Sequence, residues 1–349
     1  MAIYYTRACN FYYGSKSKLL IKEKKTLPLN GGQEISFDKI EIITRKFKKK
    51  ISIKEINQLP NKIKRIIKKD INLILKPKKN FENLNFKKIP NIMGILNITP
   101  DSFSDGGKFS KTNLAKKHLD YLFRSGANLV DIGGESTRPG SKAISPKVEW
   151  NRIKNIIKKI DKRKMISLDT RKSQIMEKGI KLGVKLINDI SGLNYDEKTI
   201  NILKKYKVPF VLQHSLDEPE VMQNNPKYKD VLLDIYDFFE KKIKLLRKAG
   251  INHNNIILDP GIGFGKNLKH NMKIMKNISI YHSLGLPIML GISRKKYIKE
   301  LSGLNDSYLR MGGTISSSIF AMMQGVQILR VHDVNEIKQG IKVFKELIK

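Results

Sequence analysis

The sequence predicts an α/β fold, a (β/α)8 TIM barrel with a small basic N-terminal accessory region. From residue 92 onward, short apolar runs alternate with longer amphipathic segments. Eight such runs occur, and each is followed by a segment with helical periodicity. The alternation extends over residues 92–349, which is close to the usual length of this barrel.

The strands are predicted from the apolar runs, and the helices from the stretches between them. The first helix places Leu114, His118, Tyr121 and Leu122 on one largely apolar face. A doubly wound sheet is the competing fold, but it would need fewer strands and would not favour a polar motif after every one. The predicted strands are 92–98, 128–132, 165–168, 185–190, 210–212, 256–258, 287–291 and 326–331, and clear helices are 112–125, 146–160, 231–249 and 307–324.

Residues 1–88 do not continue this pattern and are predicted to form a separate accessory domain of unknown role. Residues 37–44 favour a strand, and residues 53–74 favour one or two helices. Residues 76–85 are rich in Lys, Asn and Pro, a composition typical of a linker. The barrel domain is therefore assigned to residues 89–349.

The charge balance is strongly basic, with 68 Lys and Arg against 32 Asp and Glu, or +36. Residues 1–90 hold 23 basic and 7 acidic residues, or +16, so the excess is denser there. Such a balance ordinarily suggests nucleic acid. Abundant Lys, Ile and Asn can equally reflect a biased nucleotide composition, so we expect solvated faces and no nucleic-acid partner. A positive surface should nevertheless attract anionic substrates.

Cysteine content and apolar runs bear on the compartment. A single cysteine, Cys9, excludes an internal disulfide framework and a cysteine-built metal site. No run of about 18 apolar residues occurs that could span a bilayer. The first residues lack the apolar core and cleavage site of a secretory signal. We therefore expect a cytoplasmic protein with no membrane partner.

Polar motifs follow every predicted strand. In this barrel the C-terminal strand ends form the active face, so these side chains are expected at one mouth. Four cations among them can neutralise a diphosphate, because guanidinium forks match phosphate oxygens. These cations are Arg138, Lys295, Arg330 and His332.

A second group at the same mouth suits a polar heterocycle. Asp169, Asn188 and Asp259 offer acceptors and an amide that can pair with the donors of an aminopyrimidinone ring. So many polar groups converging on one mouth would cost a purely structural protein stability. The glycine-rich stretches after the first, second and sixth strands suit loops that close over a ligand.

Seven motifs together resemble those of dihydropteroate synthases, in the order and spacing of that family. The resemblance covers about residues 90–349. It implies a transferase of folate biosynthesis and a sulfonamide target. It would condense 6-hydroxymethyl-7,8-dihydropterin diphosphate with p-aminobenzoate to 7,8-dihydropteroate and diphosphate. It also implies Mg²⁺ as cofactor and a homodimer formed through barrel helices. The motifs are LNITPDSFSDGG, DIGGESTRPGS, SLDTRK, INDISG, LDPGIGFGKN, GISRK and LRVHDV.

The resemblance also implies roles for single residues. The pterin would be bound by Asp169, Asn188, Asp259 and Lys295, and the catalytic residues would be Asp105, Asp169 and Lys295. Asn97 would ligate Mg²⁺, and the diphosphate would be held by Asn97, Thr137, Arg138, Arg330 and His332. The p-aminobenzoate pocket would be lined by Phe103, Pro139, Phe264 and Lys296.

Two positions depart from the family pattern. Gln213 stands where the family usually has Met against the pterin, and Lys296 stands where it usually has Ser near the carboxylate of p-aminobenzoate. We hypothesise that the added cation at position 296 tightens carboxylate binding or alters the response to sulfonamides. Neither change touches the diphosphate residues, so the predicted reaction stands.

Other polar residues at the strand ends have plainer interpretations. Asp131 and Asp189 are expected to anchor loops, and His214 to be a buried structural histidine. Arg171 and Arg294 are as compatible with bracing ion pairs as with ligand contact.

Competing functions are a corrinoid-linked methyltransferase, a nucleic-acid-binding protein with a basic arm, and a catalytically idle barrel. A methyltransferase would need a pterin site, but it would need neither the anion-binding residues nor the two loop motifs.

Overall fold

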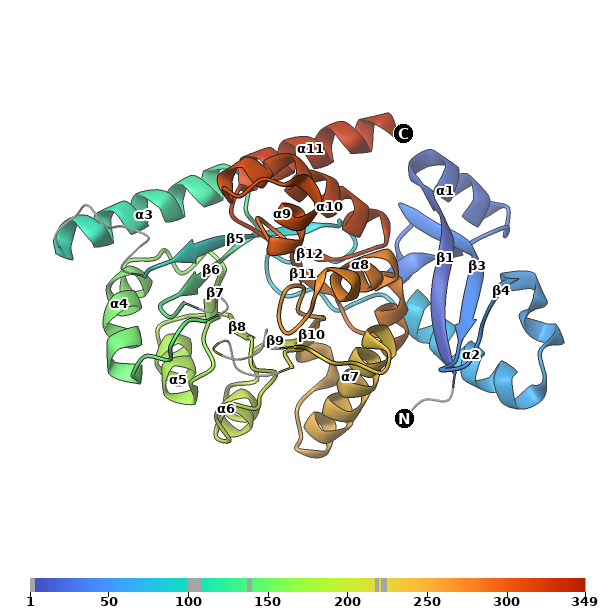
Figure 1. Cartoon of the computed structure of the whole chain (residues 1–349), viewed down its shortest axis with the longest axis horizontal. Helices are drawn as coiled ribbons and strands as arrows, with labels where there is room; N and C mark the ends of the chain where they lie inside the picture. The colour runs from blue at the N-terminus through green and yellow to red at the C-terminus, as the bar shows by residue number, and fades with distance from the viewer. Residues whose placement is uncertain (1–3, 100–107, 137–139, 217–219, 221–224, 349) are drawn as a thin grey trace.

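The computed structural model describes residues 4–99, 108–136, 140–216, 220 and 225–348. Figure 1 shows a strand barrel surrounded by helices, with the N-terminal region standing beside it. The eight barrel strands follow the order β10-β9-β8-β7-β6-β5-β12-β11, and neighbouring strands are parallel. A parallel bridge between Leu258 and Ile288 joins the two ends of this order. The predicted TIM barrel is confirmed.

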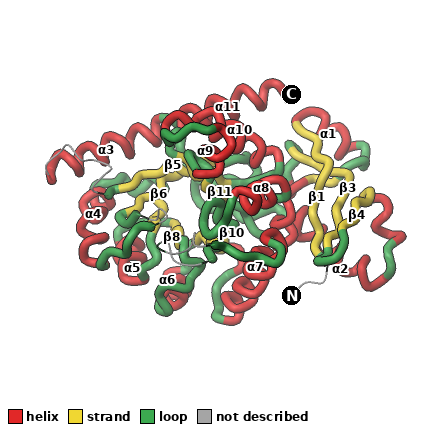
Figure 2. The backbone as a smooth tube through the Cα atoms, viewed as in Figure 1, coloured by secondary structure: helices red, strands yellow, loops and turns green. Residues whose placement is uncertain are grey.

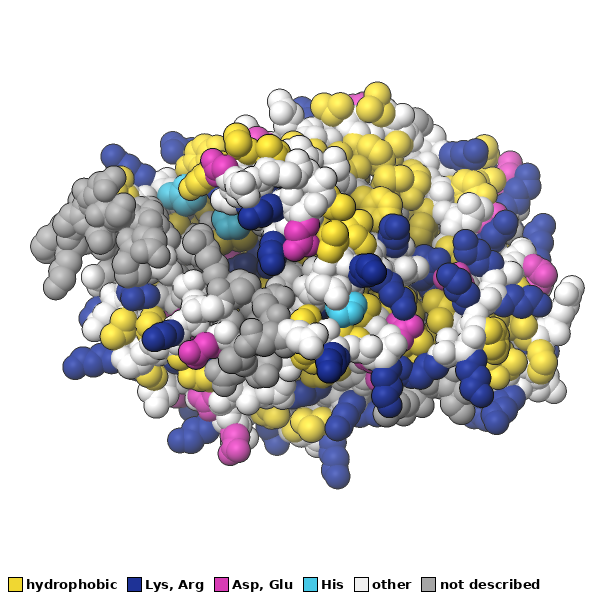
Figure 3. All heavy atoms as spheres, in the orientation of Figure 1, with side chains coloured by type: hydrophobic (Ala, Val, Ile, Leu, Met, Phe, Trp, Pro, Cys, Tyr) yellow, Lys and Arg dark blue, Asp and Glu magenta, His cyan; other side chains and the backbone are white. Residues whose placement is uncertain are grey.

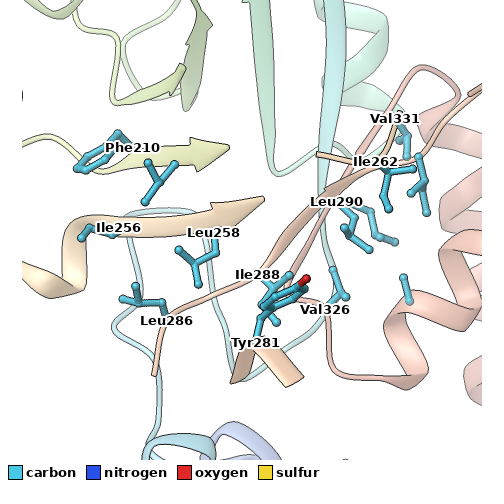
Figure 4. Close-up of a cluster of buried hydrophobic side chains, with 14 of the residues drawn as sticks. Phe210, Ile256, Leu258, Ile262, Tyr281, Leu286, Ile288, Leu290, Val326 and Val331 are labelled. Carbon is cyan, nitrogen blue, oxygen red and sulfur yellow. The ribbon is translucent and has the colours of Figure 1, made fainter. Parts of the chain in front are cut away.

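Each predicted barrel strand corresponds to an observed one, with ends that differ by a few residues. Figure 4 shows part of the main apolar core, in which Phe210, Leu258 and Leu290 come from three of these strands. The strands are β5 (Asn91–Asn97), β6 (Leu129–Gly133), β7 (Ile166–Asp169), β8 (Leu186–Asp189), β9 (Phe210–Gln213), β10 (Ile256–Asp259), β11 (Met289–Gly291) and β12 (Ile328–Val331).

The helices pack around the outside of the barrel, and their ends follow local sequence signals. Ser145 caps the fourth helix, and Pro146 occupies its first position, where a missing N–H costs nothing. Gly126 follows the third helix with a φ of 103°, a conformation that favours glycine. The helices are α3 (Lys108–Arg124), α4 (Pro146–Lys158), α5 (Ser173–Lys181), α6 (Thr199–Tyr206), α7 (Val231–Lys248), α8 (Leu268–Lys276), α9 (Lys296–Ser302), α10 (Met311–Met323) and α11 (Val334–Leu347), with 3-10 turns η4 (His253–Asn255), η5 (Ile278–Leu284) and η6 (Tyr308–Arg310).

None of the helices in the described part of the chain combines the length and the apolar character that crossing a membrane requires.

The N-terminal region is a small antiparallel sheet with helices (Figure 2). In this sheet β3 pairs with β1 on one side and with β2 and β4 on the other. The predicted strand and helices are present as β3, η2 and α2, whereas β1, α1 and β4 were not predicted. Lysines rarely favour strands, so Lys48–Ser52 is held by its pairing with β3. The elements are β1 (Tyr5–Tyr13), α1 (Gly14–Lys22), β2 (Leu27–Pro28), η1 (Leu29–Gly31), β3 (Ile35–Ile43), β4 (Lys48–Ser52), η2 (Ile53–Gln58) and α2 (Asn61–Leu75).

This region has an apolar core of its own and is also attached to the outside of the barrel. Phe37 and Ile40 belong to the separate core, whereas Tyr5 packs edge-on against Tyr236 of α7 at a centroid distance of 5.0 Å. Ser279 Oγ of η5 donates a hydrogen bond to a backbone carbonyl of β1 at 2.9 Å. Figure 3 shows Lys and Arg side chains dense over the N-terminal region.

Residues 76–85, expected to be a linker, do more than connect the two parts. Phe81 and Leu84 pair through a β-bridge, and with Phe86 they are buried against the start of the barrel strands. This segment therefore closes the N-terminal mouth of the barrel with apolar side chains, and the linker interpretation needs that correction. The barrel residues in this cluster are Met93, Leu129, Met165, Leu186, Val211, Ile257, Met289 and Ile328.

Candidate active site

An arginine at the end of β12 holds two buried carboxylates at the C-terminal mouth of the barrel. Arg330 Nε donates to Asp131 Oδ2 at 2.7 Å, and Arg330 Nη2 donates to Asp169 Oδ2 at 2.7 Å. Asn188 Nδ2 donates to the same oxygen of Asp131 at 2.9 Å. Side chains from β12, β6, β7 and β8 therefore meet in one cluster, which we call the acidic cluster (Asp131, Asp169, Asn188 and Arg330).

Several polar atoms of the acidic cluster have no hydrogen-bond partner among the described residues. Asp131 Oδ1, Asp169 Oδ1 and Asn188 Oδ1 are buried, and none accepts a hydrogen bond from the described residues. Gln213 Nε2, at the end of β9, is also buried and donates no hydrogen bond to the described residues. Each such atom costs about 1–3 kcal/mol when it stays unsatisfied. The arrangement is therefore suited to a polar ligand that carries hydrogen-bond donors.

Burial raises the affinity of two carboxylates at this mouth, Asp169 and Asp259, for protons. It raises the pKa of Asp169 to about 7, although the Arg330 charge opposes the shift. Burial likewise raises the pKa of Asp259, at the end of β10, to about 6, against a hydrogen bond of 2.7 Å from Gly261 N and the charge of Lys295. Both groups therefore titrate close to neutral pH.

Lys295 lies between the acidic residues and an aromatic side chain. Burial lowers its pKa to about 8, and the negative charges of Asp259 and Asp169 oppose that shift. Its ammonium lies 4.3 Å from the centre of the Phe264 ring, within the range of a cation–π contact. The structure thus brings Lys295, Asp259 and Phe264 together beside the acidic cluster.

Asn97, at the end of β5, reaches the same mouth. A Cβ atom added to Gly133 would lie 3.4 Å from Asn97 Oδ1 and 3.6 Å from Asp169 Oδ2. Both groups therefore lie within van der Waals reach of the end of β6. Asn97 lies next to the acidic cluster, as the sequence predicted.

The structure describes two of the remaining predicted residues, His332 and Lys296. His332 Nδ1 lies 3.1 Å from Ser293 Oγ, two residues beyond Arg330 at the same mouth. Lys296 is the first residue of α9, and its side chain is 81% exposed and 3.6 Å from Glu300. It is therefore not brought into the buried site. Five predicted residues lie outside the described part of the chain: Phe103, Asp105, Thr137, Arg138 and Pro139.

A buried ionic network braces the segment that follows β6. Glu135 accepts hydrogen bonds from Arg171 Nε at 3.1 Å and from Lys172 Nζ at 2.8 Å. Lys172 Nζ also donates to Glu149 of α4 at 2.7 Å. Ile144 N donates to Glu135 at 2.8 Å, which fixes the far end of the same segment. Arg171 thus forms a bracing ion pair, and Arg294 does so with Asp333.

Two buried residues were missed by sequence reasoning: the central position of Asp131, and the burial of Lys266 next to Phe264 and His214. Asp131 was expected to anchor a loop, but it is the shared acceptor of the acidic cluster. A carboxylate inside the apolar run 128–132 was the signal that could have shown this. Lys266 Nζ donates to the carbonyl of Phe264 at 2.8 Å and lies 3.1 Å from His214 Nδ1. Burial lowers the pKa of Lys266 to about 7.

Comparison with known proteins agrees with this geometry. Residues 93–332 match the family described as pterin binding enzyme. Dihydropteroate synthase of Escherichia coli K12 is 38% identical over 256 residues, covering 73% of this chain and 90% of that protein. The dihydropteroate synthase of Yersinia pestis, solved in complex with a sulfonamide drug, has a TM-score of 0.70 and 37% identity, covering 76% of this chain and 96% of that one. The Xanthomonas albilineans enzyme in complex with 7,8-dihydropteroate has a TM-score of 0.68 and 31% identity, covering 76% and 95%. The chain therefore belongs to the dihydropteroate synthase family of pterin-binding transferases.

Proposed function

We propose that this chain condenses 6-hydroxymethyl-7,8-dihydropterin diphosphate with p-aminobenzoate, releasing 7,8-dihydropteroate and diphosphate in folate biosynthesis. The observation that carries this proposal is the acidic cluster, whose buried oxygens Asp169 Oδ1 and Asn188 Oδ1 have no hydrogen-bond partner within the described part of the chain. Such oxygens are stable in a folded protein when a ligand supplies matching donors. The relative from Xanthomonas albilineans, in complex with 7,8-dihydropteroate, has the same fold and supports the assignment.

The pterin ring is held by the side chains deepest in the mouth. Asp169 and Asn188 receive the ring N–H donors, while Asp259 and Lys295 lie beside them. Both carboxylates are buried, so their interaction with a bound heterocycle is little screened by water. Asp131 does not need to touch the ring, because its bonds to Arg330 and Asn188 orient the cluster.

The reaction breaks the bond between the pterin methylene carbon and the diphosphate oxygen. The amine nitrogen of p-aminobenzoate forms the new bond to that carbon and then loses a proton. A ring nitrogen donates electrons to the methylene, so positive charge develops there, and Asp169 and Asp259 stabilise it. Diphosphate leaves with the electron pair of the broken bond. No protein nucleophile is needed.

The leaving diphosphate is held by cationic and polar residues at the rim of the mouth. Arg330, His332 and Asn97 supply this side of the site, with Thr137 and Arg138 assigned from the sequence. Mg²⁺ is proposed to bind here, because it usually takes one or two carboxylates together with substrate phosphates, and Asn97 adds an amide oxygen. Asn97 Oδ1 would hold the ion, and Asp105 is the proposed partner. When bound, Mg²⁺ would offset the charge of the diphosphate.

The p-aminobenzoate ring is proposed to lie against Phe264, beside Lys295. Phe103 and Pro139 are proposed to complete this pocket, and the exposed Lys296 is proposed to lie at its outer edge. We also propose that the enzyme works in the cytoplasm as a homodimer joined through its barrel helices. Exposed apolar side chains support that surface. They are Leu301 of α9, Leu309 of η6, Phe320 of α10 and Val343 of α11.

Calorimetry tests the pterin assignment directly. A pterin diphosphate with Mg²⁺ is titrated into the wild-type protein and into the Asp169→Ala variant. We expect tight binding to the wild type and a large loss in the variant, because a buried partner of the ring is removed. Equal affinities would remove Asp169 from the pterin site. Light scattering of the free protein tests the dimer.

A further inference from the structure

We propose that the N-terminal region, residues 4–88, positions the p-aminobenzoate wall of the active site through Arg45. This proposal rests on the proposed function and goes beyond it, because it gives a role to a region that lies outside the family match at residues 93–332. The contacts involved form a continuous path from the turn between β3 and β4 to Phe264.

The path begins at a fork of hydrogen bonds that joins the N-terminal region to α7. Arg45 Nη1 donates to Asp234 Oδ1 at 2.7 Å, and Arg45 Nη2 donates to Asp237 Oδ2 at 2.6 Å. Tyr5 OH donates to the other oxygen of Asp237 at 2.9 Å. The two carboxylates lie three residues apart on one face of the helix, where a planar guanidinium can reach both. We call these four residues the Arg45 clamp.

The turn that carries Arg45 is itself fixed. Thr44 N donates to the carbonyl of Phe47 at 2.8 Å, and Thr44 Oγ1 accepts from Phe47 N at 2.9 Å. Lys46 N also donates to Thr44 Oγ1 at 3.1 Å. The guanidinium is therefore presented by an ordered turn.

The clamp acts on the start of α7, which faces the catalytic mouth. Asp234 Oδ2 accepts from Asp230 N at 3.1 Å, while Asp230 Oδ1 caps the helix by accepting from Leu232 N at 3.0 Å. Asp230 Oδ2 also accepts from Lys273 of α8 at 2.9 Å. Arg45 thus supports a helix start that is tied to its neighbouring helix as well.

From this helix start the path continues to the pocket wall. Tyr228, two residues before the helix cap, donates through its hydroxyl to the carbonyl of Gly265 at 2.8 Å. The Tyr228 ring lies edge-on to His270, 5.0 Å between centroids. Phe264 precedes Gly265, and its own carbonyl accepts from Lys266. A shift of the α7 start would therefore be transmitted to Phe264, the proposed contact of p-aminobenzoate.

Attachment of the N-terminal region does not depend on Arg45 alone. Tyr13 OH donates to the Met323 carbonyl at 3.1 Å, and Ser279 Oγ donates to the Ala8 carbonyl at 2.9 Å. The Arg45 side chain is 36% exposed, and ion pairs of that kind add little to the free energy of folding. Loss of the clamp should therefore alter the pocket while the fold stays intact.

The test uses the full chain with the substitution Arg45→Gln. We expect the KM for p-aminobenzoate to rise about threefold to fivefold, the scale set by loss of the two partly exposed ion pairs of Arg45. The KM for pterin diphosphate and the melting temperature should stay at wild-type values. The Arg45→Lys variant should recover part of the loss, because it keeps the charge but not the two-pronged fork.

Glu82→Gln is the matched control. Glu82 also belongs to residues 4–88 and forms an exposed ion pair with Lys185, but it lies within the segment that closes the opposite mouth. This variant should leave both KM values unchanged. A p-aminobenzoate KM raised equally in Arg45→Gln and Glu82→Gln would overturn the proposal.

Other outcomes separate this proposal from the proposed function. Unchanged KM values in Arg45→Gln, or a parallel rise in both KM values with a lower melting temperature, would also overturn it. If the wild type makes no 7,8-dihydropteroate, the proposed function fails. Amide hydrogen exchange then tests the clamp on its own. Faster exchange at residues 228–236 and 261–266 in Arg45→Gln supports it, and unchanged exchange rejects it.

Discussion

The two mouths of the barrel are lined by the same strands, yet one mouth buries apolar side chains and the other buries polar and charged ones. In β6, Leu129 belongs to the apolar mouth and Asp131, two residues later, to the acidic cluster. Residues two apart in a strand point to the same side. In five of the strands, side chains of one inward-facing row therefore change from apolar to polar along the barrel axis. The same pairs occur as Leu186 and Asn188, Val211 and Gln213, Ile257 and Asp259, and Ile328 and Arg330.

The difference shows how stability and function are divided along the barrel axis. The apolar mouth removes Phe81, Leu84 and Phe86 from water, which favours folding. The polar mouth buries oxygens of Asp169 and Asn188 that accept no hydrogen bond from the described residues, which opposes folding until a ligand binds. The apolar mouth therefore offsets the cost of the other, and substitutions at the two mouths should have separable effects.

The largest effect is expected for Asp169→Asn at the polar mouth. We expect kcat/KM to fall about a thousandfold, or about 4 kcal/mol, because a buried charge aimed at the developing cation is removed. The melting temperature should hold, because burial disfavours the charged carboxylate in the free protein. Steady-state kinetics and thermal unfolding measure both. An activity loss below tenfold would contradict the assignment.

The opposite pattern is expected for Leu84→Ala at the apolar mouth. Leu84 is fully buried, so its truncation should cost about 3 kcal/mol of unfolding free energy. Both KM values should stay near wild type, since the site lies at the other end of the strands. Urea denaturation provides the measurement, and Leu19→Ala, at a position 54% exposed, is the control. Equal stability of the two variants would show that the segment does not close the barrel.

The pH dependence of activity should reflect the polar mouth alone. The raised pKa values of Asp259, about 6, and Asp169, about 7, predict that kcat/KM for the pterin substrate rises as these groups ionise. It should fall above pH 8 as Lys295 loses its proton, since burial lowers that pKa to about 8. Rates measured from pH 5 to 9.5 test this. A flat profile, about twofold or less across that range, would contradict it.

Below neutral pH, the free energy of unfolding should fall as pH rises, whereas activity should increase. The folded pKa of Asp259 and of Asp169 lies above the ordinary 3.8, so the folded protein binds more protons than the unfolded chain between that value and about 7. Their contribution to stability is present at low pH and is lost as pH rises through this window. Asp169→Asn should weaken this dependence, whereas Leu84→Ala should leave it intact.

The smallest effect is expected for Lys296→Ser. Lys296 is largely exposed and pairs with Glu300, so its attraction for a carboxylate is screened by water. We expect the KM for p-aminobenzoate to rise about twofold. Lys299→Ser, one turn along the same helix, is the matched control. An unchanged KM would remove Lys296 from the pocket.

Several features were predictable because they are local in sequence. The eight strands were found from apolar runs, and the polar residues after them, such as Asp169 and Asn188, were found from their place in the pattern. The strands of the N-terminal region were harder to predict from the sequence. Strand β1 begins with aromatic and β-branched residues that favour a strand, whereas β4 is rich in lysine and is held by pairing with β3.

The sequence by itself determined the barrel and the polar motif that follows each strand, because alternation and strand-end motifs are properties of neighbouring residues. The tertiary structure alone decided which of those residues meet. Arg330 was assigned to the diphosphate, yet its bonds reach Asp131 and Asp169 across sequence separations of 199 and 161 residues. It also decided that Phe81 and Leu84 close one mouth and that Arg45 reaches α7. Contacts over such separations form only when the closed barrel brings the strands and the N-terminal region together, so no local pattern encodes them.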